Sequence, residues 1–187
     1  MSTANQPAKA TWALCLICVF IYAFGNPWWM WLWPYNSPEF RWWQLVTYAF
    51  THGNVLHLAI NLLALLSFGP FLERAWGRFH LVGVYVGCAV AGAGLQMADS
   101  AQPMVGASGG LFGLFAAYTL LRPKSKLVSL FVAPLPASVV LPIYGALSVL
   151  AWIQGWLPGV AHLAHVGGAA TGILFALVLR EKENPQR

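Results

Sequence analysis

The chain has 187 residues, of which 59% are hydrophobic and only 8% are charged. This composition is too apolar for a soluble domain, and it indicates one polytopic membrane domain in contact with a lipid bilayer. The net charge of +5 does not indicate a nucleic-acid partner, because the charged residues stand in short clusters between apolar runs.

Six apolar runs predict an all-α membrane protein with a six-transmembrane-helix bundle. In chain order they are residues 11–24, 54–72, 79–97, 108–121, 137–156 and 162–179. The first run is expected to be a retained span, because no small-residue cleavage site follows it. We expect one six-helix domain over residues 11–180, between cytoplasmic tails at residues 1–10 and 181–187.

The connections between these runs carry prolines, aromatic residues and charges. Residues 25–52, here called the aromatic loop, contain several tryptophans and three prolines; tryptophans of this kind are typical of a membrane interface. Residues 73–78 are predicted to form a short charged turn, and residues 128–136 are apolar but interrupted by prolines.

The distribution of basic residues predicts the orientation of the bundle. Six spans place both termini on one side, and every Lys and Arg except Arg41 falls on that side. Basic residues favour the cytoplasmic side, so we expect cytoplasmic termini. The aromatic loop and the loop before Ser108 then face outside.

Polar residues inside the apolar runs are candidate functional residues, because their burial in a bilayer is costly. His57 and Asn61 are four residues apart and share one face of the second helix, whereas Ser108 opens the fourth helix and His165 lies early in the sixth. Counted from the cytoplasmic charges at about 1.5 Å per residue, all four lie on the order of 20 to 25 Å above the cytoplasmic edge. Packing alone does not explain three helices that place polar groups at one depth.

The string GASGG surrounds Ser108 with small residues. Gly106 and Gly109 tolerate unusual backbone dihedrals and leave room for a substrate backbone. The following helix directs the positive end of its dipole at Ser108, which favours developing negative charge there. Taken alone, the string is explained more simply as a helix-packing face.

The combined residues point to hydrolysis by a serine nucleophile. A serine hydroxyl needs a base, for which His165 is the candidate, and Phe112 lies one turn after Ser108 where it can stack on that imidazole. Asn61, His57 and the backbone N–H of Ser108 can stabilise an oxyanion. Since no acidic residue shares the depth of His165, we predict a Ser-His dyad.

A second histidine, His162, stands three residues before His165. His165 is predicted to be the base, because the glycines that follow it allow close approach to the fourth helix. We expect His162 to lie nearer the outer surface, where water solvates it.

Metal or redox chemistry is the alternative for the same residue types. No H-E-x-x-H string is present and no carboxylate shares the depth of the histidines, so we expect no metal and no cofactor. Cys15 and Cys18 have C-x-x-C spacing inside an apolar helix without a second ligand pair, and we interpret them as packing residues. The histidines considered for zinc are His52, His57, His162 and His165.

Three strings, HGNVLHLAIN, GASGGLFG and AHVGGAATG, resemble those of rhomboid intramembrane serine proteases. The resemblance covers roughly residues 40–180. It implies Ser108 as nucleophile, His165 as base, and His57 with Asn61 as oxyanion-hole contributors. It also implies cleavage of membrane-anchored protein substrates near the outer end of their transmembrane segment, by a compact form in a bacterial inner (plasma) membrane.

The resemblance further implies several supporting residues. Gly168 and Gly172 match glycines that bring the sixth helix close to the fourth. His52 matches a structural histidine, and Glu73 an acid that ties the cytoplasmic end together. Gln44 stands where many members carry arginine; because Gln has fewer donors, we expect a less rigid first outer loop.

Two other functions fit a chain of this composition. A catalytically silent relative would bind membrane proteins without cleaving them, but the intact Ser108 and His165 argue against it. A small channel or transporter is the second alternative, and it lacks charges at mid-depth and any internal repeat.

Overall fold

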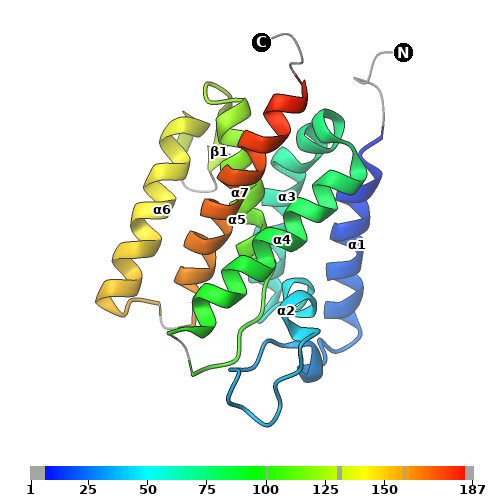
Figure 1. Ribbon diagram of the computed structural model, residues 1–187, viewed down its shortest axis with the longest axis vertical. Helices are drawn as coiled ribbons and strands as arrows, with labels where there is room; N and C mark the ends of the chain where they lie inside the picture. Colours follow the sequence, from blue (N-terminus) through cyan, green and yellow to red (C-terminus); the bar gives the residue numbers. More distant parts are fainter. Residues whose placement is uncertain (1–6, 100, 130–131, 158, 184–187) are drawn as a thin grey trace.

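The computed structural model describes residues 7–99, 101–129, 132–157 and 159–183. Long helices run side by side through the molecule, and both termini lie at one end of it (Figure 1). The long helices are α1 (Lys9–Ala23), α3 (Val55–Trp76), α4 (Arg78–Met97), α5 (Ser108–Leu121), α6 (Ala137–Gln154) and α7 (His162–Glu183). The shorter elements are η2 (Trp28–Met30), α2 (Gln44–Thr47), η3 (Tyr48–Phe50), β1 (Lys126–Ser129) and β2 (Val132–Pro136).

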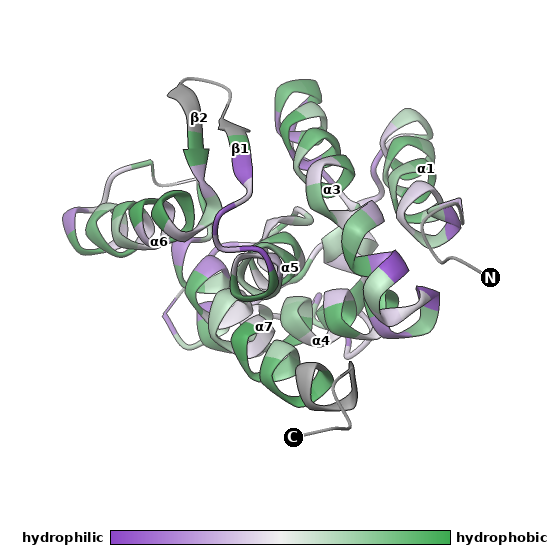
Figure 2. Cartoon of the chain, turned by 90° about the horizontal axis from the view of Figure 1, so that it is seen from above, coloured by the Kyte–Doolittle hydropathy of each residue, from purple (hydrophilic) through white to green (hydrophobic). Residues whose placement is uncertain are grey.

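Helix α5 lies in the middle of the bundle, with α3, α4, α6 and α7 around it (Figure 2). Its closest partner is α7, and glycines allow that approach. A Cβ atom added at Gly168 would overlap the carbonyl oxygen of Gly109, and one at Gly172 would overlap that of Gly113. Because only hydrogen fits there, these two helices are in backbone contact.

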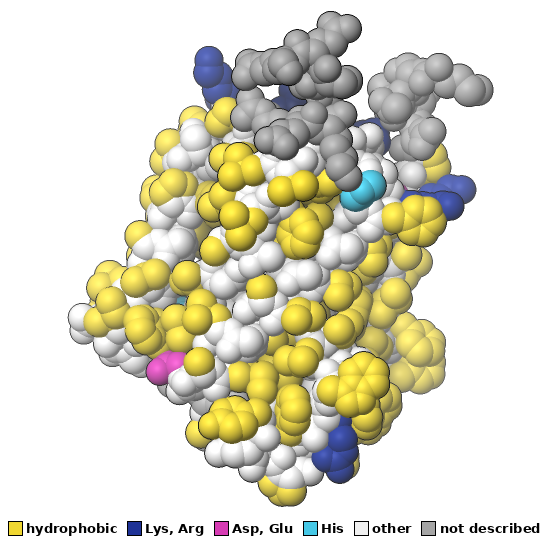
Figure 3. Space-filling model, in the orientation of Figure 1, with side chains coloured by type: hydrophobic (Ala, Val, Ile, Leu, Met, Phe, Trp, Pro, Cys, Tyr) yellow, Lys and Arg dark blue, Asp and Glu magenta, His cyan; other side chains and the backbone are white. Residues whose placement is uncertain are grey.

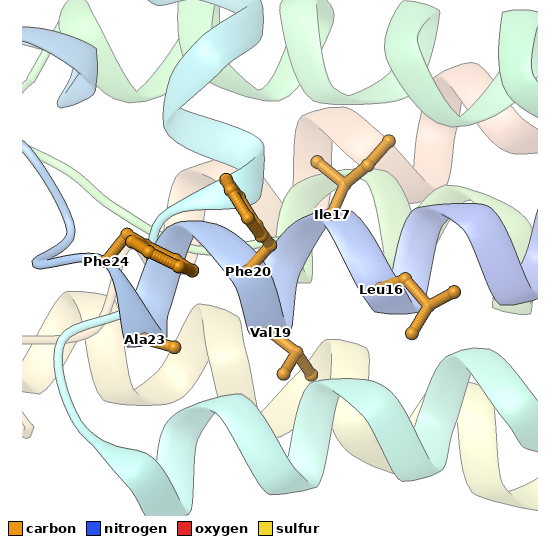
Figure 4. Close-up of a pocket in the computed structure, with 6 residues that line it drawn as sticks. All are labelled: Leu16, Ile17, Val19, Phe20, Ala23 and Phe24. Atoms are coloured by element: carbon orange, nitrogen blue, oxygen red, sulfur yellow. The ribbon is translucent and has the colours of Figure 1, made fainter.

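The surface of the bundle matches a bilayer. Hydrophobic side chains cover the middle of the molecule, and Lys and Arg lie toward its ends (Figure 3). A shallow hollow on α1 is lined entirely by apolar residues (Figure 4), as expected for a surface that meets acyl chains. Its lining consists of Leu16, Ile17, Val19, Phe20, Ala23 and Phe24.

The lengths of the helices qualify the count of spans. Within the described ranges, four helices are long and apolar enough to cross a membrane, namely α3, α4, α6 and α7. Helix α1 has 15 residues and α5 has 14, and both are apolar but shorter. The predicted helical membrane bundle is therefore confirmed, whereas full crossing by α1 and α5 stays a prediction.

The predicted charged turn at residues 73–78 is wrong, because α3 continues through Glu73 to Trp76. The Glu73 carboxylate is buried against α1, where Oε1 accepts from the N–H of Ala10 at 2.8 Å. Its Oε2 accepts from the N–H and the hydroxyl of Thr11, both at 2.8 Å. Glu73 thus caps the N-terminus of α1, where the backbone N–H groups have no helical acceptor.

The strand pair β1 and β2 was not predicted from the proline-interrupted stretch. The two strands are antiparallel, with Lys126 opposite Pro136 and Leu127 opposite Leu135. A two-stranded ladder consists only of edge strands, which tolerate proline because one side of each strand needs no partner.

The aromatic loop is organised around the fully buried side chain of Gln44. Its Nε2 donates to the carbonyls of Trp29 at 3.2 Å and Glu39 at 3.0 Å. Its Oε1 accepts from the N–H groups of Trp33 at 3.3 Å and Arg41 at 3.1 Å. One amide therefore bridges four backbone groups of the loop. The less rigid loop expected from glutamine in place of arginine does not follow.

Gln44→Ala is expected to lower the free energy of unfolding by about 2–4 kcal/mol, because four loop groups lose their partner. Thermal unfolding of the purified protein in detergent measures the change. Gln154→Ala is the matched control, since Gln154 is exposed at the end of α6. Equal melting temperatures for the two variants would contradict the bridging role.

Candidate active site

Ser108 and His165 meet between α5 and α7. Ser108 is the first residue of α5, and its Oγ lies 2.9 Å from Nε2 of His165. Both residues are half-buried. The distance is that of a hydrogen bond, which a serine nucleophile would need to its histidine base.

A stacked aromatic ring holds the His165 imidazole, and a cap on the first turn of α7 fixes the helix that carries it. The ring of Phe112 stacks on it, with centroids 4.2 Å apart and planes inclined by 4°. From α4, Oε1 of Gln96 accepts from the N–H groups of Leu163 at 3.0 Å and Ala164 at 3.3 Å. Gln96 therefore caps the first turn of α7. The sequence analysis did not predict this cap. The only sign of it in the sequence is an amide side chain near the end of an apolar run.

Gly106 brings His57 to the loop that carries Ser108. Its φ is +125°, and a Cβ atom there would lie 2.6 Å from Cε1 of His57. The His57 imidazole thus rests directly on the Gly106 backbone, two residues before Ser108. Glycine is required at this position both for its backbone conformation and for the space.

Asn61 lies one turn along α3 from His57 and is buried. Its Nδ2 donates to the carbonyl of His57 at 2.7 Å. An amide nitrogen carries two protons, so this bond uses one of them. Asn54 caps the same helix by accepting from the N–H of His57 at 2.8 Å. The structure therefore fixes the first turns of α3 beside the loop of Gly106.

His52 is fully buried at the end of the aromatic loop, and its backbone is tied to the start of that loop. Its N–H donates to Oδ1 of Asn26 at 3.0 Å, and Nδ2 of Asn26 donates to the His52 carbonyl at 2.7 Å. The rings of His52 and His57 are 5.2 Å apart, in an edge-on arrangement. His52 thus lies against a candidate oxyanion residue and has no contact with Ser108 among the hydrogen bonds of the described residues.

The expectation that water solvates His162 is wrong. Its side chain is 7% exposed, and its Nε2 lies 3.0 Å from the carbonyl of Trp156. The chain before α7 folds back over this histidine, which the sequence pattern does not show. Within the described ranges, no three His, Cys, Asp or Glu side chains are grouped as metal ligands.

A serine that was not predicted lies on the far side of the His165 ring. Ser148 belongs to α6, and its Oγ is 3.2 Å from Nδ1 of His165. In the sequence it is a serine inside an apolar run, which gives no signal of a partner 17 residues away.

Comparison with known proteins finds related sequences over most of the chain. The family model described as Rhomboid domain matches residues 39–182. The chain is similar to Rhomboid protein 1, mitochondrial, of Saccharomyces cerevisiae, at 30% identity over 77% of this chain and 44% of that protein. It is similar to Rhomboid protease GlpG of Klebsiella pneumoniae, at 32% identity over 90% of this chain and 62% of that protein. This chain therefore spans less than two thirds of the length of these relatives.

Proposed function

Because the chain belongs to the rhomboid family, we propose that it is an intramembrane serine endopeptidase in which Ser108 is the nucleophile and His165 the general base. The hydrogen bond of 2.9 Å between Ser108 Oγ and His165 Nε2 carries this proposal. Rhomboid protease GlpG, the similar protein from Klebsiella pneumoniae, is a protease by its name.

The reaction follows from the positions of these atoms. Nε2 of His165 removes the hydroxyl proton as Ser108 Oγ attacks the carbonyl carbon of the scissile peptide. The same nitrogen then donates that proton to the leaving amine, which leaves an acyl-enzyme for water to hydrolyse. Phe112 keeps the orientation of the imidazole during both proton transfers, because its stacked ring blocks rotation of the imidazole toward α5.

The oxyanion lies, in this proposal, beside the loop of Gly106. The backbone N–H of Ser108 stands at the N-terminus of α5, where helical acceptors are absent and the dipole favours negative charge. The His57 imidazole and the second N–H of Asn61 supply further donors from α3.

His57→Ala and Asn61→Ala are each expected to slow cleavage by about 10²–10³-fold without abolishing it, which is the typical effect of one oxyanion donor. The measurement is kcat with a transmembrane substrate in liposomes. Ser67→Ala is a control on the same helix, since its exposed hydroxyl bonds the carbonyl of Leu63. Wild-type rates in both single variants would exclude the oxyanion role.

The substrates in this proposal are transmembrane proteins cut near the outer end of their membrane segment. Helix α5 has 14 residues, which gives it a length of about 21 Å. If its C-terminus lies at the cytoplasmic edge, Ser108 lies about 10 Å below the outer edge of a hydrocarbon core about 30 Å thick. We further propose a bacterial inner membrane with both termini in the cytoplasm.

This orientation predicts which thiols an impermeant reagent reaches. A cysteine introduced at Ser125, between α5 and β1, should react only from the cytoplasmic side, and one at Ala101 only from outside. The native cysteines, Cys15, Cys18 and Cys88, are buried and free, so their background reaction is low. The reverse pattern, measured on intact cells and inverted vesicles, would overturn the orientation.

Covalent labelling with a fluorophosphonate tests the function itself. The reagent phosphonylates an activated serine, so the wild-type protein should be labelled at Ser108, and peptide mass mapping identifies the position. A catalytically silent relative would remain unlabelled under conditions in which a known serine hydrolase reacts completely.

A further inference from the structure

The His165 imidazole has bonding partners at both ring nitrogens. Nε2 lies 2.9 Å from Oγ of Ser108 on α5, and Nδ1 lies 3.2 Å from Oγ of Ser148 on α6. Ser148 is 7% exposed, and its helix is otherwise strongly apolar. A buried hydroxyl in such a helix is expected to have a polar partner, because an unpaired one is costly.

The position of the protons follows from the role of Ser108. For Nε2 to accept the hydroxyl proton of Ser108, the neutral ring must carry its own proton on Nδ1. That Nδ1–H points at Ser148 Oγ, which has two lone pairs to accept it. In the tautomer in which the base is competent, the Ser148 hydroxyl thus accepts the proton of Nδ1.

The carboxylates whose side chains the structure describes are engaged elsewhere. Oδ2 of Asp99 accepts from Nε1 of Trp152 at 2.7 Å, and Glu73 caps α1. Glu39 bonds the hydroxyl of Ser37 within the aromatic loop. None of these three reaches His165, so Ser148 takes the place that a carboxylate holds in a Ser-His-Asp triad.

We propose that Ser148 is a positioning residue that orients the His165 base from α6, extending the dyad to a Ser108–His165–Ser148 chain of hydrogen bonds. The inference rests on the proposed function. When His165 takes the proton of Ser108, the imidazolium keeps its Nδ1–H bond to Ser148, and no proton passes to the Ser148 hydroxyl. The bond also makes the competence of the base depend on the position of α6 relative to α7.

The test compares Ser148→Ala with Ser148→Thr, which keeps a hydroxyl, and with the control Ser67→Ala, whose hydroxyl bonds within α3. Each full-length protein is assayed in liposomes for kcat and KM with a transmembrane substrate. Ser148→Ala is expected to lower kcat about tenfold with KM unchanged, the loss of roughly one hydrogen bond in the transition state. Ser148→Thr should recover most of that loss, and Ser67→Ala should equal the wild type.

The rate of fluorophosphonate labelling separates positioning from packing. The reagent is small, so its reaction reports the activation of Ser108 independently of how a transmembrane substrate reaches it. We expect Ser148→Ala to slow labelling by the same factor as kcat. Labelling at the wild-type rate, or a change in KM alone, would overturn the inference and assign Ser148 to the packing of α6.

Nitrogen NMR of labelled histidines supplies a readout on the protein with Ser148 unchanged. The wild-type protein should show His165 with its proton on Nδ1, and the assignment comes from the signal that disappears in His165→Ala. A proton on Nε2 would overturn the inference even if Ser148→Ala did not fold. Failure of the wild type to react with fluorophosphonate would instead refute the proposed function.

Discussion

Ser108→Ala is expected to reduce cleavage of a transmembrane substrate by about 10⁴-fold or more, as loss of the nucleophile does in serine proteases. The protein should still fold, because Ser108 is half-buried at the first position of α5 and alanine is a good helix former. Its hydroxyl bonds His165 across two helices, yet the backbone contact between α5 and α7 depends on glycines that the substitution leaves unchanged.

The measurement is single-turnover cleavage by purified protein in liposomes, together with thermal unfolding. Ser67→Ala removes the same hydroxyl from an exposed site on α3 and should retain full activity. Residual cleavage by Ser108→Ala above a few per cent of wild type, in a preparation free of other proteases, would exclude Ser108 as the nucleophile.

The helices were predictable because apolar runs in this chain end at charges, glycines and prolines. The fourth run and α5 have the same limits, residues 108–121. The sequence predicts a turn at Glu73, because a charge interrupts the apolar run there, and this prediction is wrong. The partners of Glu73 are Ala10 and Thr11, 63 and 62 residues away in sequence. Sequence alone does not distinguish an exposed carboxylate from a buried one that accepts hydrogen bonds from the first N–H groups of a distant helix.

In the candidate site, too, the sequence predicts features that depend on neighbouring residues and misses contacts between distant segments. Ser108, His165, His57 and Asn61 were found because polar residues at one depth in apolar runs are unusual. Ser148 was missed because a serine inside a helix ordinarily bonds its own backbone. Gln44 and Gln96 were also undervalued, since the carbonyls and N–H groups that they bridge belong to other segments. Sequence shows which groups are polar, but the packing of helices decides their partners.

His165→Ala is expected to abolish cleavage, whereas His162→Ala should retain most of it. His165 is the histidine whose ring bonds Ser108 Oγ, at 2.9 Å from Nε2, and stacks on Phe112. Without this base the serine hydroxyl stays protonated, and we expect a loss of about 10⁴-fold or more in kcat. Both variants are measured in the same liposome assay with the same substrate.

The two histidines differ in what their nitrogens contact. The ring centroids are 6.2 Å apart and the planes are nearly perpendicular, so His162 lies edge-on to the base without replacing it. Its Nε2 bonds the Trp156 carbonyl, in the connection between α6 and α7. His162→Ala therefore removes one partly buried hydrogen bond and should lower the free energy of unfolding by about 1–2 kcal/mol, with kcat within about threefold of wild type. An inactive His162→Ala beside an active His165→Ala would place the base one turn nearer the start of α7, and the contact between Ser108 and His165 would then have no catalytic role.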